Sequence, residues 1–132
     1  MFDEVLDALH RTGCRFVVIG SVARALTGEQ VFAHDLDVMI DASPDGRRRL
    51  CRALSALDAT VETRDGWQPI ERCAVLPWEW GFRVSTAAGQ VDLITQLIDG
   101  TTIEDHDAHA TGVQLCTGSR VRVHPTRHLE AA

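Results

Sequence analysis

The first part of the chain alternates between two hydrophobic periods, one typical of helices and one typical of strands. Helical spacing of apolar residues over positions 2–9 predicts a short amphipathic helix. Positions 15–19 form a nearly continuous apolar run and predict a buried strand. Gly20 and Ser21 interrupt this run, and positions 22–26 favour a second helix. The expected order is therefore helix, strand, tight turn and helix.

An alternating segment follows at positions 35–41. Its apolar residues occupy every second place from Leu36 to Ile40, which is the period of a strand that is buried on one face. Asp35 and Asp37 occupy the alternate positions. Both carboxylates are therefore expected on the opposite face of this strand.

The middle of the chain predicts another helix and a hairpin. Ser43 and Pro44 are a typical N-cap and first helical residue, and leucines at helical spacing continue the helix to Leu57. Positions 82–86 and 90–94 flank a short glycine-bearing connection, which is typical of an antiparallel hairpin.

The remaining segments carry weaker patterns. Further strands are expected at four places, which are position 61 and positions 73–76, 113–115 and 121–123. A polar loop is expected from Asp99 to His109, and a last helix is expected to begin at Thr126. The whole pattern predicts one α/β (α+β) domain over residues 1–132, with a mixed sheet of about four to six strands flanked by helices.

Composition and charge narrow the function classes. The 132 residues are 45% hydrophobic and 24% charged, and no apolar run approaches the roughly 20 residues of a membrane span. The first residues are acidic and lack the positive region of a secretory signal, so a cytoplasmic protein without a membrane role is expected. The net charge of −6 argues against a long basic groove for nucleic acid, so any RNA would be bound locally. The four scattered cysteines are expected to be structural thiols.

The aspartates and the Gly-Ser turn together indicate phosphate chemistry. Asp35 and Asp37 on one strand face lie about 6.6 to 7 Å apart, which suits a pair of Mg²⁺ ions separated by about 4 Å. Asp92 lies on the face of its strand opposite Val91 and Leu93 and supplies a third carboxylate. Gly20 and Ser21, at the start of a helix, offer backbone N–H groups and a hydroxyl to a triphosphate.

Several other residues have two interpretations from sequence. Arg24 either reaches the phosphates or substrate, or is an exposed arginine without such a role. His34 either contacts phosphate or substrate, or is an ordinary exposed histidine. The polar segment 104–109 is expected to be solvated rather than to bind metal. The three tryptophans, Trp67, Trp78 and Trp80, are expected to fill the core rather than to stack on a base.

The residues that carry this chemistry resemble a known family. Three segments in order, Gly20-Ser21-Val22-Ala23-Arg24, Asp35-Leu36-Asp37-Val38 and Val91-Asp92-Leu93, resemble the DNA polymerase β-like nucleotidyltransferase superfamily. The resemblance is to its small bacterial members, the minimal nucleotidyltransferases and the abortive-infection type toxin nucleotidyltransferases. It implies Asp35 and Asp37 as metal ligands, Asp92 as third carboxylate and candidate base, and the Gly-Ser turn as the holder of the nucleoside triphosphate.

Three functions follow from this resemblance. The first is Mg²⁺-dependent transfer of a nucleoside monophosphate from a triphosphate such as ATP to a hydroxyl of a macromolecule, either tRNA or another RNA or a partner protein, in a toxin–antitoxin or defence pair. The second is nucleotidyl transfer to a small molecule of the antibiotic type. The third is a degenerate nucleotidyltransferase fold that serves as a nucleotide-binding or interaction module.

Overall fold

The computed structural model describes residues 2–70 and 76–126. The helices in these ranges are α1 (Asp3–Arg11), α2 (Gly20–Leu26), α3 (Pro44–Ala56) and α4 (Ile103–Ala108). The strands are β1 (Phe16–Ile19), β2 (Leu36–Ile40), β3 (Thr60–Thr63), β4 (Gly66–Pro69), β5 (Gly81–Thr86), β6 (Gly89–Ile94), β7 (Thr111–Gln114) and β8 (Arg120–Val123).

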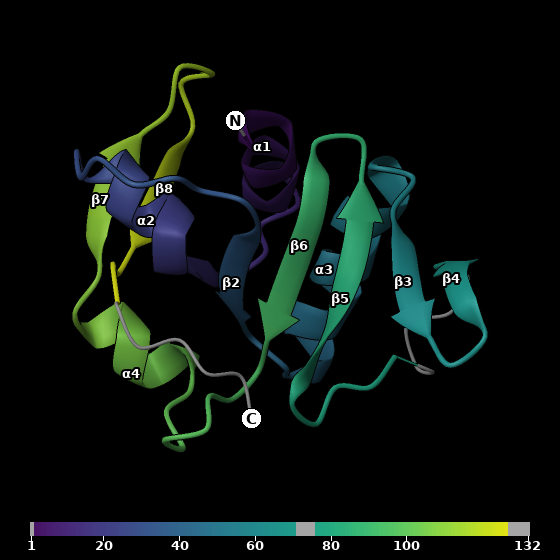
Figure 1. The fold of residues 1–132 in the computed structure, drawn as a ribbon. Helices are drawn as coiled ribbons and strands as arrows, with labels where there is room; N and C mark the ends of the chain where they lie inside the picture. Colours follow the sequence, from purple (N-terminus) through teal and green to yellow (C-terminus); the bar gives the residue numbers. More distant parts are fainter. Residues whose placement is uncertain (1, 71–75, 127–132) are drawn as a thin grey trace.

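These strands form one mixed sheet in the order β4-β3-β5-β6-β2-β1-β8-β7 (Figure 1). The pairs β2–β6 and β1–β8 are parallel, and the other neighbours are antiparallel. The expected α/β class is confirmed. The expected four to six strands are wrong, because eight strands pair in the described part of the chain. The edge strand β4 is exposed at every position, so it shows no alternation by which the sequence could reveal it.

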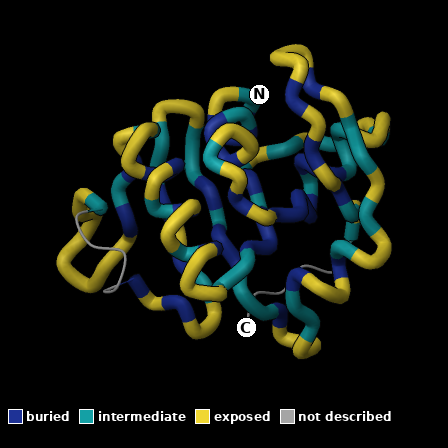
Figure 2. The backbone as a smooth tube through the Cα atoms, turned by 180° about the vertical axis from the view of Figure 1, so that it is seen from behind, coloured by how far each residue is buried: buried dark blue, intermediate teal, exposed yellow. Residues whose placement is uncertain are grey.

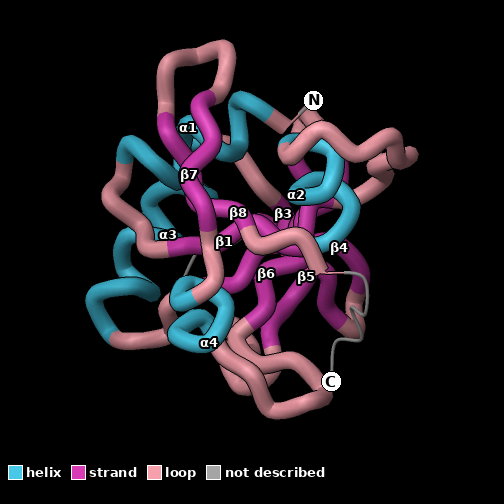
Figure 3. Tube along the Cα trace, turned by 90° about the vertical axis from the view of Figure 1, so that its left-hand side faces the viewer, coloured by secondary structure: helices cyan, strands magenta, loops and turns pink. Residues whose placement is uncertain are grey.

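Helices α1 and α3 pack together over one face of the sheet, where the main core lies (Figure 3). Leu6 and Leu9 of α1 and Leu50 of α3 are fully buried there against strand residues such as Val38 and Leu93. Ser43 caps α3 by accepting a hydrogen bond from the Gly46 amide at 3.2 Å, as its sequence predicted. Figure 2 shows burial concentrated in the central strands, with exposed residues around the periphery.

Helix α4 packs on the opposite face, over a smaller core. Its Ile103 joins Val17 and Ile19 of β1, Met39 of β2 and Ile94 of β6. The expected polar loop from Asp99 to His109 is therefore wrong. Helix α4 has six residues, and Ile103 is its only large apolar side chain, so the sequence shows no helical period there.

Ion pairs and a capping box hold α4 in place. Thr102 and Asp105 form the reciprocal capping box. The guanidinium of Arg15 pairs with Glu104 at 3.1 Å and with Asp107 at 3.3 Å. The segment 104–109 was expected to be solvated, but Glu104 and Asp107 form ion pairs with Arg15, the residue before β1.

Other expectations have mixed outcomes. Trp78 is buried and meets Phe82 edge to face, as expected for a core residue. Trp67 and Trp80 are 42% and 46% exposed, so the expectation that they fill the core is wrong. Cys51 is disulfide-bonded, which corrects the expectation of four structural thiols. Residues 73–75 of the strand expected at 73–76 lie outside the described residues, and so do residues 127–132 of the helix expected from Thr126.

In the described ranges, the helices are too short or too polar for any of them to cross a bilayer.

Candidate active site

Four neighbouring strands place the candidate acids in a row across the sheet. Asp37 of β2 is in register with Asp92 of the parallel strand β6. On its other side Asp37 faces Ile19 of β1, and Asp92 faces Arg83 of β5. Residues directly opposite one another on paired strands project from the same face. The strands that carry Asp37 and Asp92 are thus neighbours, and both side chains lie on the face that α4 partly covers.

Asp35 lies beside this row, two residues before Asp37 along the chain, rather than within it. Strand β2 begins at Leu36, so Asp35 is the residue before the strand and is partly exposed. Its negative charge acts on Asp37 and on Arg83. The structure therefore brings the three candidate acids into one electrostatic neighbourhood, with Asp37 in the middle.

The Asp37 carboxyl has a strongly raised pKa. Burial, the charge of Asp92, a hydrogen bond shared with that side chain and the charge of Asp35 together raise its pKa to about 7, against the lowering effect of the Arg83 charge. Burial of Asp37 is the largest of these causes. Its neighbours Ile19 and Met39 are fully buried, which explains the loss of solvent. The pair of carboxylates therefore holds negative charge that the surrounding residues compensate only in part.

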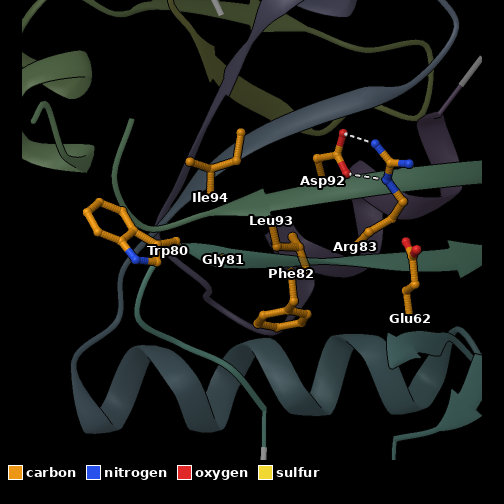
Figure 4. A pocket seen from close by; sticks show the side chains of 8 residues that line it. All are labelled: Glu62, Trp80, Gly81, Phe82, Arg83, Asp92, Leu93 and Ile94. Atoms are coloured by element: carbon orange, nitrogen blue, oxygen red, sulfur yellow. Dashed lines mark hydrogen bonds and ion pairs between the residues drawn. The ribbon is translucent and has the colours of Figure 1, made fainter. Parts of the chain in front are cut away.

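Arg83 supplies that partial compensation. Its Nε lies 2.7 Å from Oδ1 of Asp92, and its Nη2 lies 3.3 Å from Oδ2 (Figure 4). The hydrogen bond and the charge of Asp92 raise the pKa of Arg83. Sequence reasoning missed this residue. The register of the hairpin could have found it, because positions 83 and 92 are equally distant from the turn that joins β5 and β6.

A cavity of about 280 Å³ adjoins the Arg83–Asp92 pair. Its lining comprises Glu62, Trp80, Gly81, Phe82, Arg83, Asp92, Leu93 and Ile94 (Figure 4). Strands β5 and β6 form its floor, with Trp80 at one end and Glu62 at the other. The cavity thus borders one candidate acid directly, while Asp35 and Asp37 lie beside it.

The Gly-Ser turn lies next to the acids. Gly20 has a φ of +73°, which lets β1 turn at once into α2. Because Ile19 is opposite Asp37, the two residues that follow Ile19 lie beside the start of β2, where Asp35 is located. The turn and the three acids are therefore brought together at one end of β1 and β2.

Arg24 and His34 are directed elsewhere. The Arg24 guanidinium pairs with Glu29 at 2.8 Å, which raises the pKa of Arg24. His34 is exposed, and its ring lies 4.9 Å from that of Phe32. The structure gives neither side chain a contact with the acids.

The donor chemistry of the row fits a hard divalent cation. Residues 2–70 and 76–126 contain no group of three or more His, Cys, Asp or Glu side chains arranged to hold a metal by themselves. Mg²⁺ does not need one, because it takes one or two carboxylates and completes its shell with water and phosphate oxygens. Asp37 and Asp92 provide such a pair, and their mutual repulsion is the kind of charge that a cation would neutralise.

Comparison with known proteins identifies the family. The family model for aminoglycoside-2''-adenylyltransferase matches residues 1–75, which is more than half of the chain. The chain belongs to the aminoglycoside-2''-adenylyltransferase family. It is therefore a nucleotidyltransferase, which confirms the enzyme class and the resemblance to small bacterial nucleotidyltransferases. A comparison with curated proteins gives no match.

Solved structures show that this family member has the nucleotidyltransferase fold. A crystal structure of a Thermotoga maritima protein described as a nucleotidyltransferase has a TM-score of 0.63 at 20% identity, over 94% of this chain and 74% of that one. A solution structure of the antibiotic-resistance factor ANT(2'')-Ia has a TM-score of 0.60 at 15% identity, over 93% of this chain and 62% of that one. A crystal structure of ANT(2'')-Ia in complex with adenylyl-2''-tobramycin has the same score and identity, with 66% of that chain covered.

The raised pKa of Asp37 predicts how the stability of this adenylyltransferase-family chain depends on pH. The folded state holds the proton more tightly than the unfolded state, so this group lowers stability progressively as pH rises from about 4 to about 7. Asp37→Asn removes the effect and should raise the free energy of unfolding by about 2 kcal/mol at about pH 8, with no gain below about pH 4. This figure is about half of what the full shift corresponds to, because the side chain is partly exposed.

Urea unfolding with a chelator present measures this difference. Asp65→Asn, in the exposed turn between β3 and β4, is the matched control and should change stability little at either pH. An Asp37→Asn variant less stable than the wild type at the higher pH would contradict the electrostatic account of this site.

Proposed function

We propose that this chain transfers a nucleoside monophosphate from a nucleoside triphosphate, with Mg²⁺, to a hydroxyl of a small polycationic aminosugar of the aminoglycoside class. The observation that carries the proposal is the cavity beside Asp92, which combines carboxylates with an exposed aromatic ring. Family membership supports the same acceptor class, because ANT(2'')-Ia is described in complex with adenylyl-2''-tobramycin. The chain spans 62% and 66% of the two ANT(2'')-Ia chains.

The cavity has the chemistry of a cationic sugar site. Glu62 and Asp92 present carboxylates at its wall, where protonated amines of an aminosugar would pair with them. Trp80 is 46% exposed and offers a ring face to a sugar or an ammonium group. A volume of about 280 Å³ suits part of such a molecule, with the remainder in solvent. Asp92 lies at the boundary between this cavity and the row of acids, and it would accept the proton of the attacking hydroxyl.

The row of acids and the turn supply the nucleotide side of the reaction. Asp35, Asp37 and Asp92 would hold Mg²⁺, with two ions expected. When bound, the metal supplies charge neutralisation at the phosphates. Gly20 and Ser21 would hold the triphosphate through backbone N–H groups and the serine hydroxyl.

Two further residues complete the nucleotide side. Arg24 would reach the phosphates after exchanging its pairing with Glu29 for a nucleotide. His34, exposed on the loop before Asp35, would contact the nucleotide or the acceptor.

The RNA or protein acceptor that the sequence suggested stays a prediction without a supporting structural feature. The net charge of −6 and the carboxylates of the cavity favour a cation over a polyanion. The toxin–antitoxin setting and the cytoplasmic location also stay predictions.

The test offers both acceptor classes to the same enzyme. Purified protein is incubated with each labelled nucleoside triphosphate, Mg²⁺, and either a panel of aminoglycosides or total tRNA and cell lysate, and labelled products are identified by mass spectrometry. We expect a nucleoside monophosphate on an aminoglycoside hydroxyl. Glu62→Gln should raise KM for the aminoglycoside with little change in KM for the nucleotide, while Asp65→Asn, on the same hairpin but outside the cavity, should change neither. Label only on tRNA or a protein would refute the small-molecule acceptor.

A further inference from the structure

Three histidines cluster outside the acids and the cavity, between α4 and the end of β8. The ring of His124 lies 5.1 Å from that of His106 and 5.8 Å from that of His109, measured between centroids. His106 is only 6% exposed, which is unusual for a residue that titrates near neutral pH. The nucleotidyl-transfer proposal gives these residues no role.

A hydrogen-bond chain fixes the ring of His124. The hydroxyl of Thr101 lies 2.6 Å from a carboxylate oxygen of Asp99 and 2.8 Å from Nε2 of His106. Nδ1 of His106 in turn lies 2.9 Å from Nδ1 of His124. Four groups from three segments of the chain are thus connected in series.

The carboxylate at one end sets the direction of every bond in this chain. An ionised carboxylate only accepts, so Thr101 donates its proton to Asp99, and these bonds hold the pKa of Asp99 below its usual range. The hydroxyl oxygen then accepts from Nε2–H of His106, which leaves Nδ1 of a neutral His106 as an acceptor. That atom must accept from Nδ1–H of His124. In neutral His124 the remaining nitrogen, Nε2, therefore carries a lone pair, and it has no hydrogen-bond partner within residues 2–70 and 76–126.

The backbone places His124 in the same row as the acids. The His124 amide donates to the Val18 carbonyl at 2.9 Å, and Val123 is in parallel register with Val18. His124 is therefore the neighbour of Ile19, and Ile19 is the neighbour of Asp37. Two strand spacings, about 10 Å, separate His124 from Asp37, and the Gly-Ser turn begins at the residue after Ile19.

We propose that His124 binds the terminal phosphates of the nucleoside triphosphate through Nε2–H, and that Asp99, Thr101 and His106 are positioning residues that orient its ring. The inference rests on the proposed function, because it assumes a triphosphate whose α-phosphate lies near the acids. A tail held by the Gly-Ser turn points away from Asp92 and towards the His124 side of the row. The group that leaves as pyrophosphate would then be next to a proton-carrying imidazole.

The electrostatics of the cluster make this binding dependent on protonation. Burial lowers the pKa of His106 and of His124, and the positive charge of His109 lowers both further. His124 also lowers the pKa of His106, while Asp99 and Asp105 raise it. Without an anion the pair is therefore largely neutral at physiological pH.

A phosphate changes this balance at one nitrogen only. Negative charge beside Nε2 favours the protonated form of His124. When Nε2 of His124 is protonated, its Nδ1–H still donates to His106, so the series of hydrogen bonds from Asp99 to His124 stays intact. The other two acids on α4 are already paired with arginines, Glu104 with Arg15 and Asp107 with Arg15 and Arg122, and do not compete for this ring.

Nucleotide binding across pH tests the proposal without turnover. The ligand for calorimetry is an α,β-methylene nucleoside triphosphate analogue with Mg²⁺. Between about pH 8.5 and about pH 5.5, the affinity of the wild type should rise by about tenfold more than the affinity of His124→Asn. This factor corresponds to a rise of one unit in the pKa of His124 when the phosphate binds. The asparagine amide can still donate to His106 but lacks the distal nitrogen. A nucleoside monophosphate, which has no terminal phosphates, should show the same pH profile with both proteins.

Two control variants and one spectroscopic measurement test the same inference. His124→Gln, which keeps a neutral donor near the Nε2 position, should retain part of the affinity but not the extra pH dependence. His10→Asn, at an exposed position of α1, should behave as the wild type. Imidazole ¹⁵N NMR of the wild type should show protonated Nδ1 in neutral His124 and protonated Nε2 in His106. The reverse tautomers would overturn the proposal.

The outcomes separate this inference from the proposed function. Wild type and His124→Asn binding the triphosphate analogue with one pH profile would overturn only the role of His124. A wild-type protein that binds no nucleotide at any pH would overturn both proposals.

Discussion

Asp37→Asn is expected to lower kcat for nucleotidyl transfer by about a thousandfold while leaving the fold intact. Asp37 is the middle carboxylate of the row, in contact with Asp92 and within the field of Asp35. The amide has nearly the same volume but no charge, so it removes the attraction for a divalent cation and leaves the packing in place. Steady-state kinetics with saturating nucleotide and Mg²⁺ measure the loss, and circular dichroism checks the fold.

The combination of effects distinguishes a metal-binding role from a structural one. The same variant is expected to be more stable than the wild type above neutral pH, so activity and stability should move in opposite directions. Asp65→Asn should retain wild-type kcat. A variant at position 37 that keeps more than about a tenth of the activity would remove this residue from the catalytic machinery, since loss of such a group ordinarily costs about a hundredfold or more.

Gly81→Ala is expected to destabilise the protein by about 3 kcal/mol or more. Gly81 has a φ of +123°, and a Cβ there would lie 2.1 Å from the Leu93 carbonyl oxygen and 2.9 Å from the Ile94 Cα. Both atoms belong to the backbone of the partner strand, so they can move only if the pairing of β5 with β6 is disturbed. The same change would also disturb the floor of the cavity beside Asp92.

Gly66→Ala separates the steric effect from backbone conformation. Gly66 also has a positive φ, +95°, but a Cβ there meets no atom within 4 Å. This control should lose only about 1 kcal/mol, the cost of holding an alanine in the left-handed region. Urea unfolding of both variants gives the comparison, and equal losses would show that the contact with β6 has no energetic consequence.

The row of acids was predictable from the sequence because two kinds of signal agreed. The alternation around Asp37 and around Asp92 gave the face of each strand, and the resemblance to nucleotidyltransferases assigned the aspartates of both strands to one metal site. Alternation alone could not place β6 beside β2, because the paired residues Asp37 and Asp92 are 55 positions apart in the sequence and a parallel pair has no turn to fix its register.

The histidine cluster was not predictable, since its burial depends on tertiary packing. His106 lies in a segment of mostly polar residues that lacks helical periodicity, so solvent exposure was the natural expectation. One local signal was present, because Thr102 and Asp105 have capping-box spacing. No local signal could show that His124, eighteen positions further on, would complete the hydrogen-bond chain.

Strand β2 is paired on both sides, by β1 and by β6, and its apolar side chains are completely or almost completely buried. Local opening of such a strand exposes as much surface as unfolding most of the domain, whereas an edge strand such as β4 can fray at little cost. Asp37 is therefore carried by one of the segments with the lowest expected rate of fluctuation. Its repulsion from Asp92 cannot be relieved by separation of the strands. The two carboxylates therefore stay close together in the folded protein before any cation binds, and a cation that binds relieves their repulsion without a change of the backbone.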